Sequence, residues 1–274
     1  MKYSILGAAL LATSAVAAPL TASRQAREQA RRLHNGKARH QSHPPYKPGT
    51  RQLLHPSNSH KDITQEQYDS NWAGAVLVGT GYTAVSAEFQ VPTPQAPAGG
   101  DSSTQYCASA WVGIDGDTCS TAILQTGVDF CVQGGSVTYD AWYEWYPDAA
   151  YDFSGISISS GDTIRVTVDA FSTSTGNATI ENTSNGQTVS HSFSGVQGDL
   201  CEYNAEWIVE DFESGGGMVP FADFGTVTFT NAQASDGGST VGPSGASVMD
   251  IQQNSTVLTS SSISGNSVTV QYNS

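Results

Sequence analysis

From about residue 85 to the C-terminus, apolar and polar side chains alternate repeatedly with a period of two. The clearest runs cover residues 85–91, 137–146 and 163–169, and shorter runs lie near 206–210, 226–230 and 267–271. Clusters of Gly, Ser, Asp and Asn separate the runs, and no helical period is convincing. Because successive side chains of a strand point to opposite faces of a sheet, this pattern predicts strands. We therefore expect an all-β fold, a single antiparallel β-sandwich of the jelly-roll type.

Charge is distributed very unevenly along the 274 residues. Ten of the 11 Lys and Arg residues lie in the first 61 positions, whereas the chain from residue 65 onward holds one base, Arg165, and 23 acidic residues. That part carries a net charge of −22, which would repel phosphate groups and argues against a nucleic-acid partner. Protonation of its carboxylates in acid relieves their mutual repulsion, so the composition favours a protein that works at low pH.

The N-terminal part has the composition of targeting and processing segments. Residues 1–18 combine Lys2, a short apolar stretch and a small-residue cleavage site, which predicts a signal peptide and a secreted, extracellular protein. No other apolar run is long enough to span a membrane. Residues 19–64 are basic, and we expect a propeptide that binds and inhibits the acidic body and loosens in acid. Residues 65–274 should form the one folded domain of a monomer.

Two further features concern a secreted chain. Its four cysteines predict two disulfide bonds, with three connectivities open, among Cys107, Cys119, Cys131 and Cys201. Three Asn-X-Ser/Thr sequons, which begin at Asn177, Asn182 and Asn254, permit N-glycosylation.

The chain lacks the material for several common enzyme sites. His191 is the one histidine after residue 64, which leaves almost nothing for a Ser-His-Asp triad or a multi-histidine zinc site. We expect His191 to pack on the apolar side of a strand beside Val189 and Phe193. The Asp-Thr/Ser-Gly sequences of pepsin-like peptidases and a P-loop are absent too. Carboxylates, amides, hydroxyls and aromatic side chains remain, and they suit an acid hydrolase or a carbohydrate binder.

One expected strand, residues 139–146, mixes carboxylates with aromatic side chains. Asp140, Trp142 and Glu144 share one face of it, whereas Tyr139, Tyr143 and Trp145 share the other. The first face could line a groove, and the plainer interpretation is a half-exposed strand of an acidic protein.

A second segment, residues 205–212, places Glu206 and Glu210 in alternation with apolar side chains. Partial burial of Glu210 near the strand end would shift its pKa. Together with Glu144, Glu210 also fits a jelly-roll glycoside hydrolase, which needs an acid opposite a nucleophile or base. A non-catalytic, lectin-like binder is a further alternative.

Several motifs are longer and more specific than these patterns. They are SNWAGAV at 70–76, WVGIDGDTC at 111–119, TAILQTGVDF at 121–130, YDAWYEWYP at 139–147, AEWIVEDF at 205–212 and GSTVGP at 238–243. Together they resemble the glutamic peptidases, or eqolisins, and within them the aspergilloglutamic peptidase group of secreted fungal acid proteases. The resemblance runs from the signal peptide to the C-terminus. It implies a concanavalin-like sandwich of two large antiparallel sheets, bent to form a substrate groove.

The resemblance also implies an endopeptidase of proteins and peptides that uses Gln125 and Glu210, and not Glu206, as its catalytic dyad. Glu210 would act as general base on water, and Gln125 would hold the oxyanion. Glu210 then needs hydrogen bonds to its charged form to stay ionised in acid. This chemistry needs neither metal nor cofactor, and pepstatin should not inhibit it. By the same resemblance, motif positions expected in or beside the groove are Trp72, Trp111, Asp115, Asp129, Asp140, Trp142, Glu144 and Phe212.

The disulfide pairs that the family implies are Cys107–Cys131 and Cys119–Cys201. Enzymes of the aspergilloglutamic group carry a basic, glycine-rich insert before the YCASAW motif, and its excision leaves two chains. Here residues 92–105 are shorter and contain no Lys or Arg. We therefore expect a single-chain mature enzyme that begins somewhere between residues 58 and 68.

Overall fold

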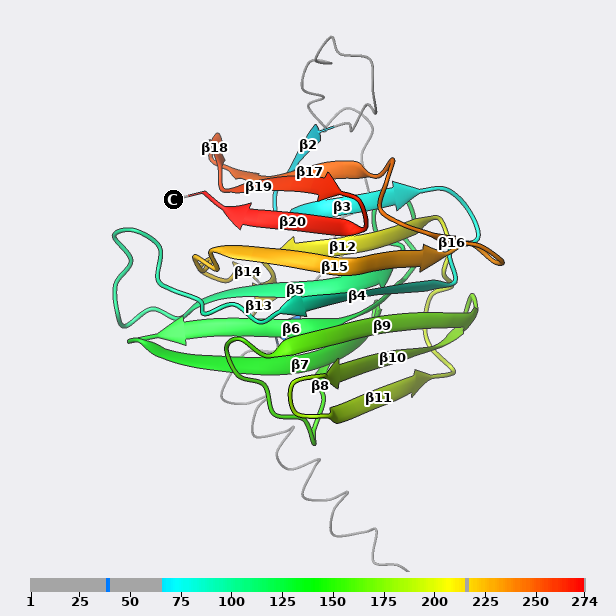
Figure 1. Ribbon diagram of the computed structural model, residues 1–274, viewed down its shortest axis with the longest axis horizontal. Coiled ribbons are helices and arrows are strands. Elements are labelled where there is room, and N and C mark those ends of the chain that lie inside the picture. Colours follow the sequence, from blue (N-terminus) through cyan, green and yellow to red (C-terminus); the bar gives the residue numbers. More distant parts are fainter. Residues whose placement is uncertain (1–37, 40–65, 215–216, 274) are drawn as a thin grey trace, which may run out of the picture. The chain divides into compact units, whose positions relative to one another are not determined.

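The computed structural model describes residues 38–39, 66–214 and 217–273, and these residues form strands, turns and loops without a helix. Two large sheets lie one over the other (Figure 1). Neighbouring strands are antiparallel except for one parallel pair, β2 and β17. The expected antiparallel β-sandwich is therefore confirmed. The expected signal peptide and nearly all of the expected propeptide lie outside the described residues.

The first sheet has nine strands in the order β18-β17-β3-β12-β5-β6-β7-β8, with β2 beside β17. Its strands are β2 (Glu66–Asp69), β3 (Trp72–Val78), β5 (Tyr106–Ile114), β6 (Ile123–Gln133), β7 (Ser136–Tyr146), β8 (Tyr151–Asp152), β12 (Asn204–Glu210), β17 (Ser247–Gln253) and β18 (Thr256–Val257).

The second sheet has eight strands in the order β11-β10-β9-β4-β15-β20-β19, with β16 beside β15. Its strands are β4 (Ala84–Gln90), β9 (Thr163–Ser172), β10 (Thr175–Asn182), β11 (Gln187–Phe193), β15 (Thr226–Ser235), β16 (Thr240–Val241), β19 (Thr259–Ser264) and β20 (Ser267–Tyr272). A small third sheet joins β1 (Ala38–Arg39), β13 (Glu213–Ser214) and β14 (Gly217–Met218).

The main core lies between the two large sheets. In β4, for example, Val85, Ala87 and Phe89 are buried while their neighbours are half-buried or exposed, as the alternation predicts. Trp145 of β7 and Trp207 of β12 enter the same core from the nine-stranded sheet. Burial of each such large apolar side chain stabilises the fold by about 1.5–3 kcal/mol.

The nine-stranded sheet is also apolar on its outer face. A second cluster of buried side chains covers this face, made of Trp72, Val76, Trp111, Ile123, Trp142, Ile208 and Met249. Strands β5 and β12 are consequently buried along their whole length. A strand with two buried faces needs no polar alternation, which explains why β3, β5 and β6 escaped the period-two analysis.

The structure contains two disulfide bonds, and they are the pairs that the family resemblance implies. Cys107–Cys131 links the paired strands β5 and β6, and Cys119–Cys201 fastens the loop after β5 to the loop before β12. His191 packs as expected: its ring stacks on Tyr143 with centroids 4.0 Å apart. No helix among the described residues is long and apolar enough to cross a membrane.

Candidate active site

The outer face of the nine-stranded sheet gathers the expected site residues from β12, β5, β6 and β7. Strand pairing arranges them in three levels. The first level holds Glu206, Gly113, Gln125 and Glu144; the second holds Ile208, Trp111, Gly127 and Trp142; the third holds Glu210, Ser109, Asp129 and Asp140. Asp140, Trp142 and Glu144 thus share one face of β7, as the sequence predicts.

Glu210 ends β12 and is completely buried. Its carboxylate accepts hydrogen bonds from the Trp111 indole N–H at 2.8 Å and from the Asn71 side-chain amide at 3.0 Å. Both donors favour the ionised form. Burial nevertheless raises the pKa of Glu210 well above its ordinary value, outweighing the hydrogen bond from Trp111, and the charges of Asp129 and Asp211 raise it further. The hydrogen bonds that a base ionised in acid needs are therefore present, whereas burial in the full-length chain opposes ionisation.

Gln125 lies on β6 and is also buried. Its amide Nε2 donates to Glu144 Oε2 at 2.9 Å, and its Oε1 has no hydrogen-bond partner. In register Gln125 lies level with Glu206, and two levels away from Glu210. The side chain at the intervening level of β5 is Trp111, which connects the two parts of the site.

Two glycines make room for the Trp111 side chain. A Cβ atom at Gly127 would lie 2.5 Å from the Trp111 Cβ, and one at Gly113 would lie 2.9 Å from the indole ring. The edge of Trp72 packs against the same indole, with ring centroids 4.9 Å apart. Trp111 is therefore held from three directions, which fixes its N–H toward Glu210.

Other expected residues lie around this centre. The Trp142 indole N–H donates to the Ser109 hydroxyl at 3.1 Å, which ties β7 to β5. Asp140 is exposed, whereas Asp129 and Phe212 are buried. Contact of these side chains with a substrate remains a prediction.

Asp115 has a structural task one residue beyond β5. Its two carboxylate oxygens accept four backbone N–H groups, from residues 201 to 204, at 2.7–3.2 Å. Burial still raises its pKa. Among the described residues, the one candidate group of metal ligands is Asp115 with Cys119 and Cys201. Those two cysteines are joined in a disulfide and cannot serve as thiolate ligands.

Sequence reasoning missed two residues that support Glu210 and its neighbour Asp211. The Asn71 backbone carbonyl accepts the N–H of Asp211 at 2.9 Å, while its side chain holds Glu210. Gln253 donates from Nε2 to Asp211 Oδ2 at 2.7 Å and to the Ser70 carbonyl at 3.0 Å. Asn71 belongs to the SNWAGAV motif, whose recurrence in the family was the available signal. Nothing in the sequence points to Gln253, which is 182 positions beyond Asn71.

Asp211 should make the free energy of unfolding decrease as the pH rises toward neutrality. Burial raises its pKa to about 7, partly offset by the hydrogen bond from Gln253. An unfolded aspartate titrates near pH 3.9, so the folded state alone keeps this proton between about pH 4 and 7. Its contribution to stability is complete below that window and is lost as the pH rises through it. At about 1.4 kcal/mol per pH unit, the loss is about 4 kcal/mol.

Asp211→Asn cannot lose a proton and should therefore remove this dependence. We expect the variant to exceed wild type by about 4 kcal/mol in unfolding free energy above pH 7, and to match it near pH 3. Denaturant unfolding at both pH values measures the difference, with the exposed Asp199→Asn as control. Equal pH slopes for Asp211→Asn and wild type would contradict the assignment.

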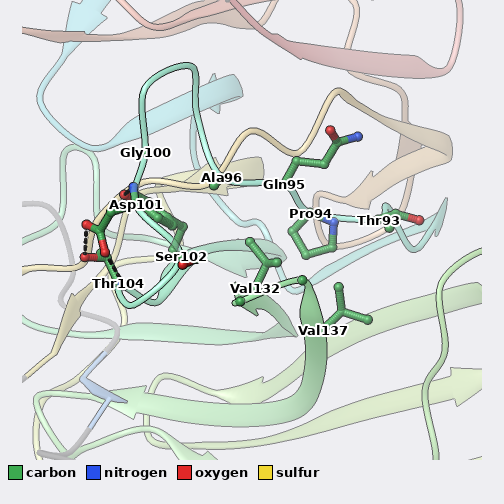
Figure 2. Close-up of a pocket in the computed structure, with 13 residues that line it drawn as sticks. Thr93, Pro94, Gln95, Ala96, Gly100, Asp101, Ser102, Thr104, Val132 and Val137 are labelled. Atoms are coloured by element: carbon green, nitrogen blue, oxygen red, sulfur yellow. Dashed lines mark hydrogen bonds between the residues drawn. The ribbon is translucent and has the colours of Figure 1, made fainter.

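A pocket lies away from these levels, between the loop after β4 and the β6–β7 hairpin (Figure 2). Pro94, Val132 and Val137 form its apolar wall. The Asp101 carboxylate stabilises the loop after β4, because it accepts hydrogen bonds from the backbone N–H and hydroxyl groups of Ser103 and Thr104. Neither Gln125 nor Glu210 lines this pocket, so it is separate from the candidate site.

Solved structures of glutamic peptidases share this sandwich. Scytalido-glutamic peptidase bound to a transition-state analogue inhibitor is 46% identical, with a TM-score of 0.68, over 75% of this chain and 99% of that one. Aspergilloglutamic peptidase from Aspergillus niger is 72% identical, with a TM-score of 0.60, over 61% of this chain and 99% of that one. The protein is a glutamic endopeptidase, a hydrolase of peptide bonds.

Comparison of the sequence gives the family. The model of the peptidase A4 family matches residues 70–272. Aspergillopepsin-2 of Aspergillus niger is 61% identical over 288 aligned positions, which cover 99% of this chain and all of that protein. Scytalidopepsin B of Scytalidium lignicola is 47% identical over 74% of this chain and 78% of its own length. The chain belongs to the peptidase A4 family, and the glycosidase and lectin alternatives are set aside.

Proposed function

We propose that the protein is a secreted acid endopeptidase, made as a zymogen, whose catalytic dyad is Glu210 and Gln125. The observation that carries this proposal is the hydrogen bonding of Glu210, whose two oxygens accept N–H groups from Asn71 and Trp111. These fixed donors orient the carboxylate and favour its charge once water reaches it. Gln125 faces the same side of the sheet and cannot titrate.

The reaction follows from these two groups. Glu210 takes a proton from a water molecule, and the water oxygen attacks the carbonyl carbon of the scissile peptide. The amide N–H of Gln125 that is not bound to Glu144 stabilises the oxyanion. The C–N bond then breaks as Glu210 returns the proton to the leaving amine. Trp72, Trp111, Trp142 and Phe212 would supply apolar contacts to the substrate, and Asp129, Asp140 and Glu144 polar ones.

Digestion of a denatured protein at about pH 3, with and without pepstatin, tests the class of catalysis. We expect equal rates, because pepstatin mimics the intermediate of a two-aspartate site and the proposed dyad has one titrating member. A matched digestion by a pepsin-like enzyme should be abolished. Inhibition of this protein by pepstatin would refute the proposed dyad.

Two observations support the zymogen proposal: the burial of Gln125 and Glu210, and the pairing of one strand from the expected propeptide. In the full-length chain Gln125 and Glu210 are at most 1% exposed. A substrate therefore needs a part of the chain to move away before it can reach them. Strand β1, from the expected propeptide, pairs antiparallel with β13, with Arg39 in register with Glu213, three residues after Glu210. If the propeptide covers the site next to this strand pair, its removal would rehydrate Glu210 and lower its pKa toward the value that a base needs.

Acid should release this inhibition. We expect the full-length zymogen to lose its N-terminal segment below about pH 4 without added peptidase, because carboxylates lose charge there while leader histidines stay positive. Arg39→Glu lowers the net positive charge of the leader by two and should activate at a higher pH than wild type. Electrophoresis and activity, followed against pH, measure both. Intact, latent zymogen that persists in acid would refute the electrostatic clamp.

A further inference from the structure

The three sequons differ sharply in their surroundings. Asn182 is completely buried, and its amide Nδ2 donates to the Ser157 carbonyl and to Asp162 at 2.9 and 2.7 Å. Asn177 lies in the middle of β10, where its amide donates to the Thr179 hydroxyl and its Oδ1 accepts hydrogen bonds from two serine hydroxyls of β11. A glycan at Asn177 would break contacts between β10 and β11, and one at Asn182 would break its contacts with the loop before β9.

Asn254 is different. It is exposed and forms, with Ser255, the two-residue turn between β17 and β18, in which Gln253 pairs with Thr256. Both turn residues have positive φ, 49° and 66°, which is typical of a tight hairpin turn. A glycan attached to Asn254 would extend into solvent without disturbing either sheet.

We propose that Asn254 is an N-glycosylation site, and that Asn177 and Asn182 remain unmodified in the folded protein. The donor is a lipid-pyrophosphate-linked oligosaccharide of the secretory pathway. The Asn254 side-chain nitrogen bonds to the anomeric carbon of the first sugar and loses one proton. The bond from that carbon to the pyrophosphate oxygen breaks, and the lipid pyrophosphate leaves with the electron pair.

The test uses the full-length chain secreted from a yeast host. Mass spectrometry before and after peptide-N-glycosidase should show one glycan on wild type and on Thr256→Ser, and none on Thr256→Ala, which leaves Asn254 in place. Thr179→Ala, which removes the Asn177 sequon, should keep the glycan. An unmodified wild type, or a glycan that survives in Thr256→Ala, would overturn the assignment.

A separate observation concerns Glu206, which the proposed mechanism does not use. Glu206 is completely buried, and neither of its carboxyl oxygens has a hydrogen-bond partner. In register it borders Gly113 on one side, and Gln125 borders the same glycine on the other. A Cβ atom at Gly113 would lie 3.2 Å from Glu206 Oε2 and 3.4 Å from the Gln125 Cβ. The unpartnered acid and the residue that carries the unpartnered amide oxygen therefore flank the same glycine.

A carboxylate without partners is unstable in such a place, whereas a neutral carboxyl group has an O–H to donate. The pKa of Glu206 is raised well above its ordinary value by burial and by the charge of Asp115. Glu144, bound to the far side of the Gln125 amide, is the other acid at this level. Burial and the charge of Asp115 therefore both favour a protonated Glu206.

We infer that Glu206 is a positioning residue, a neutral acid that donates a hydrogen bond to Gln125 Oε1 directly or through one water molecule. With Oε1 held there and one N–H on Glu144, the second N–H of Gln125 points to the oxyanion. This inference rests on the proposed role of Gln125. It assigns Glu206 a proton that must stay in place, in contrast to the proton that Glu210 exchanges.

Glu206→Gln and Glu206→Leu separate this role from a purely structural one. Gln also donates a hydrogen bond, so Glu206→Gln should keep kcat within about threefold of wild type and should lose any alkaline decline that Glu206 ionisation causes. Glu206→Leu should lower kcat at least tenfold with little change in KM. Full kcat in a folded Glu206→Leu would overturn the inference. Gln125→Ala, assayed alongside, reports separately on the dyad, since its full activity would refute the proposed function instead.

Discussion

Glu210→Gln should lower kcat on a denatured protein in acid by about 10³-fold or more, because it removes the group that takes the proton from water. Gln is nearly isosteric with Glu, and the Asn71 and Trp111 donors can still bind its carbonyl oxygen on one side. The fold and KM should therefore change little. The loss would appear in kcat, as expected for an interaction needed in the transition state.

The measurement must separate catalysis from maturation. Both proteins should be trimmed by the same wild-type enzyme, their new N-termini compared, and the wild-type enzyme then removed. Glu181→Gln is a matched control, because Glu181 lies on the other sheet and pairs with the exposed Arg165. Unchanged activity in Glu210→Gln would exclude Glu210 as the base, and Glu206 would be the next carboxylate to replace.

Gln125→Ala should cost about 10²- to 10³-fold in kcat, equivalent to about 2.7–4 kcal/mol, the range found when an oxyanion donor is removed. The substitution changes no charge, so substrate binding should be affected much less. Glu144, which now binds the Gln125 amide at 2.9 Å, would lose that donor. Circular dichroism and unfolding of the variant check that the sheet is intact.

Gln125→Glu gives this prediction a dependence on pH. The carboxyl group that this substitution introduces can donate one hydrogen bond while it is protonated, whereas its ionised form repels an oxyanion. Activity should thus survive best at the lowest pH and fall as the introduced acid ionises, more steeply than in wild type. An unaltered pH profile in Gln125→Glu, or full activity in Gln125→Ala, would show that Gln125 does not face the oxyanion.

Burial of the dyad in the full-length chain connects these predictions to activation. The hydrogen bonds to Glu210 suit a carboxylate, yet its pKa is raised because burial dominates. In the proposed zymogen, we expect an uncovered site to keep the donors and regain water, so that the same residues serve the latent and the active form. The zymogen experiment therefore examines the site while it is buried, and the Glu210→Gln experiment examines the same site after water can reach it.

The local pattern of the sequence was sufficient to predict the fold class and the face of β7 that carries Asp140, Trp142 and Glu144. The alternation in β4 follows directly from a strand with one face toward the core, so it can be recognised without knowledge of other strands. In residues 139–146 the period of two placed Asp140, Trp142 and Glu144 on one face of β7, although Trp142 and Glu144 on that face are buried as well. The motifs then supplied the family, and with it Gln125, Glu210 and the disulfide pairs.

Tertiary structure alone decided which side chains meet. Strands β3, β5 and β6 show no alternation because both their faces are buried, and their order in the sheet comes from pairing between distant segments. Pairing placed Glu206, and not Glu210, level with Gln125, and it brought Gln253 to Asp211. Burial, which sets the pKa of Glu210, likewise exists only once the sheet is assembled. Residue types and their local period are properties of a segment, whereas register, desolvation and hydrogen-bond partners are properties of the folded chain.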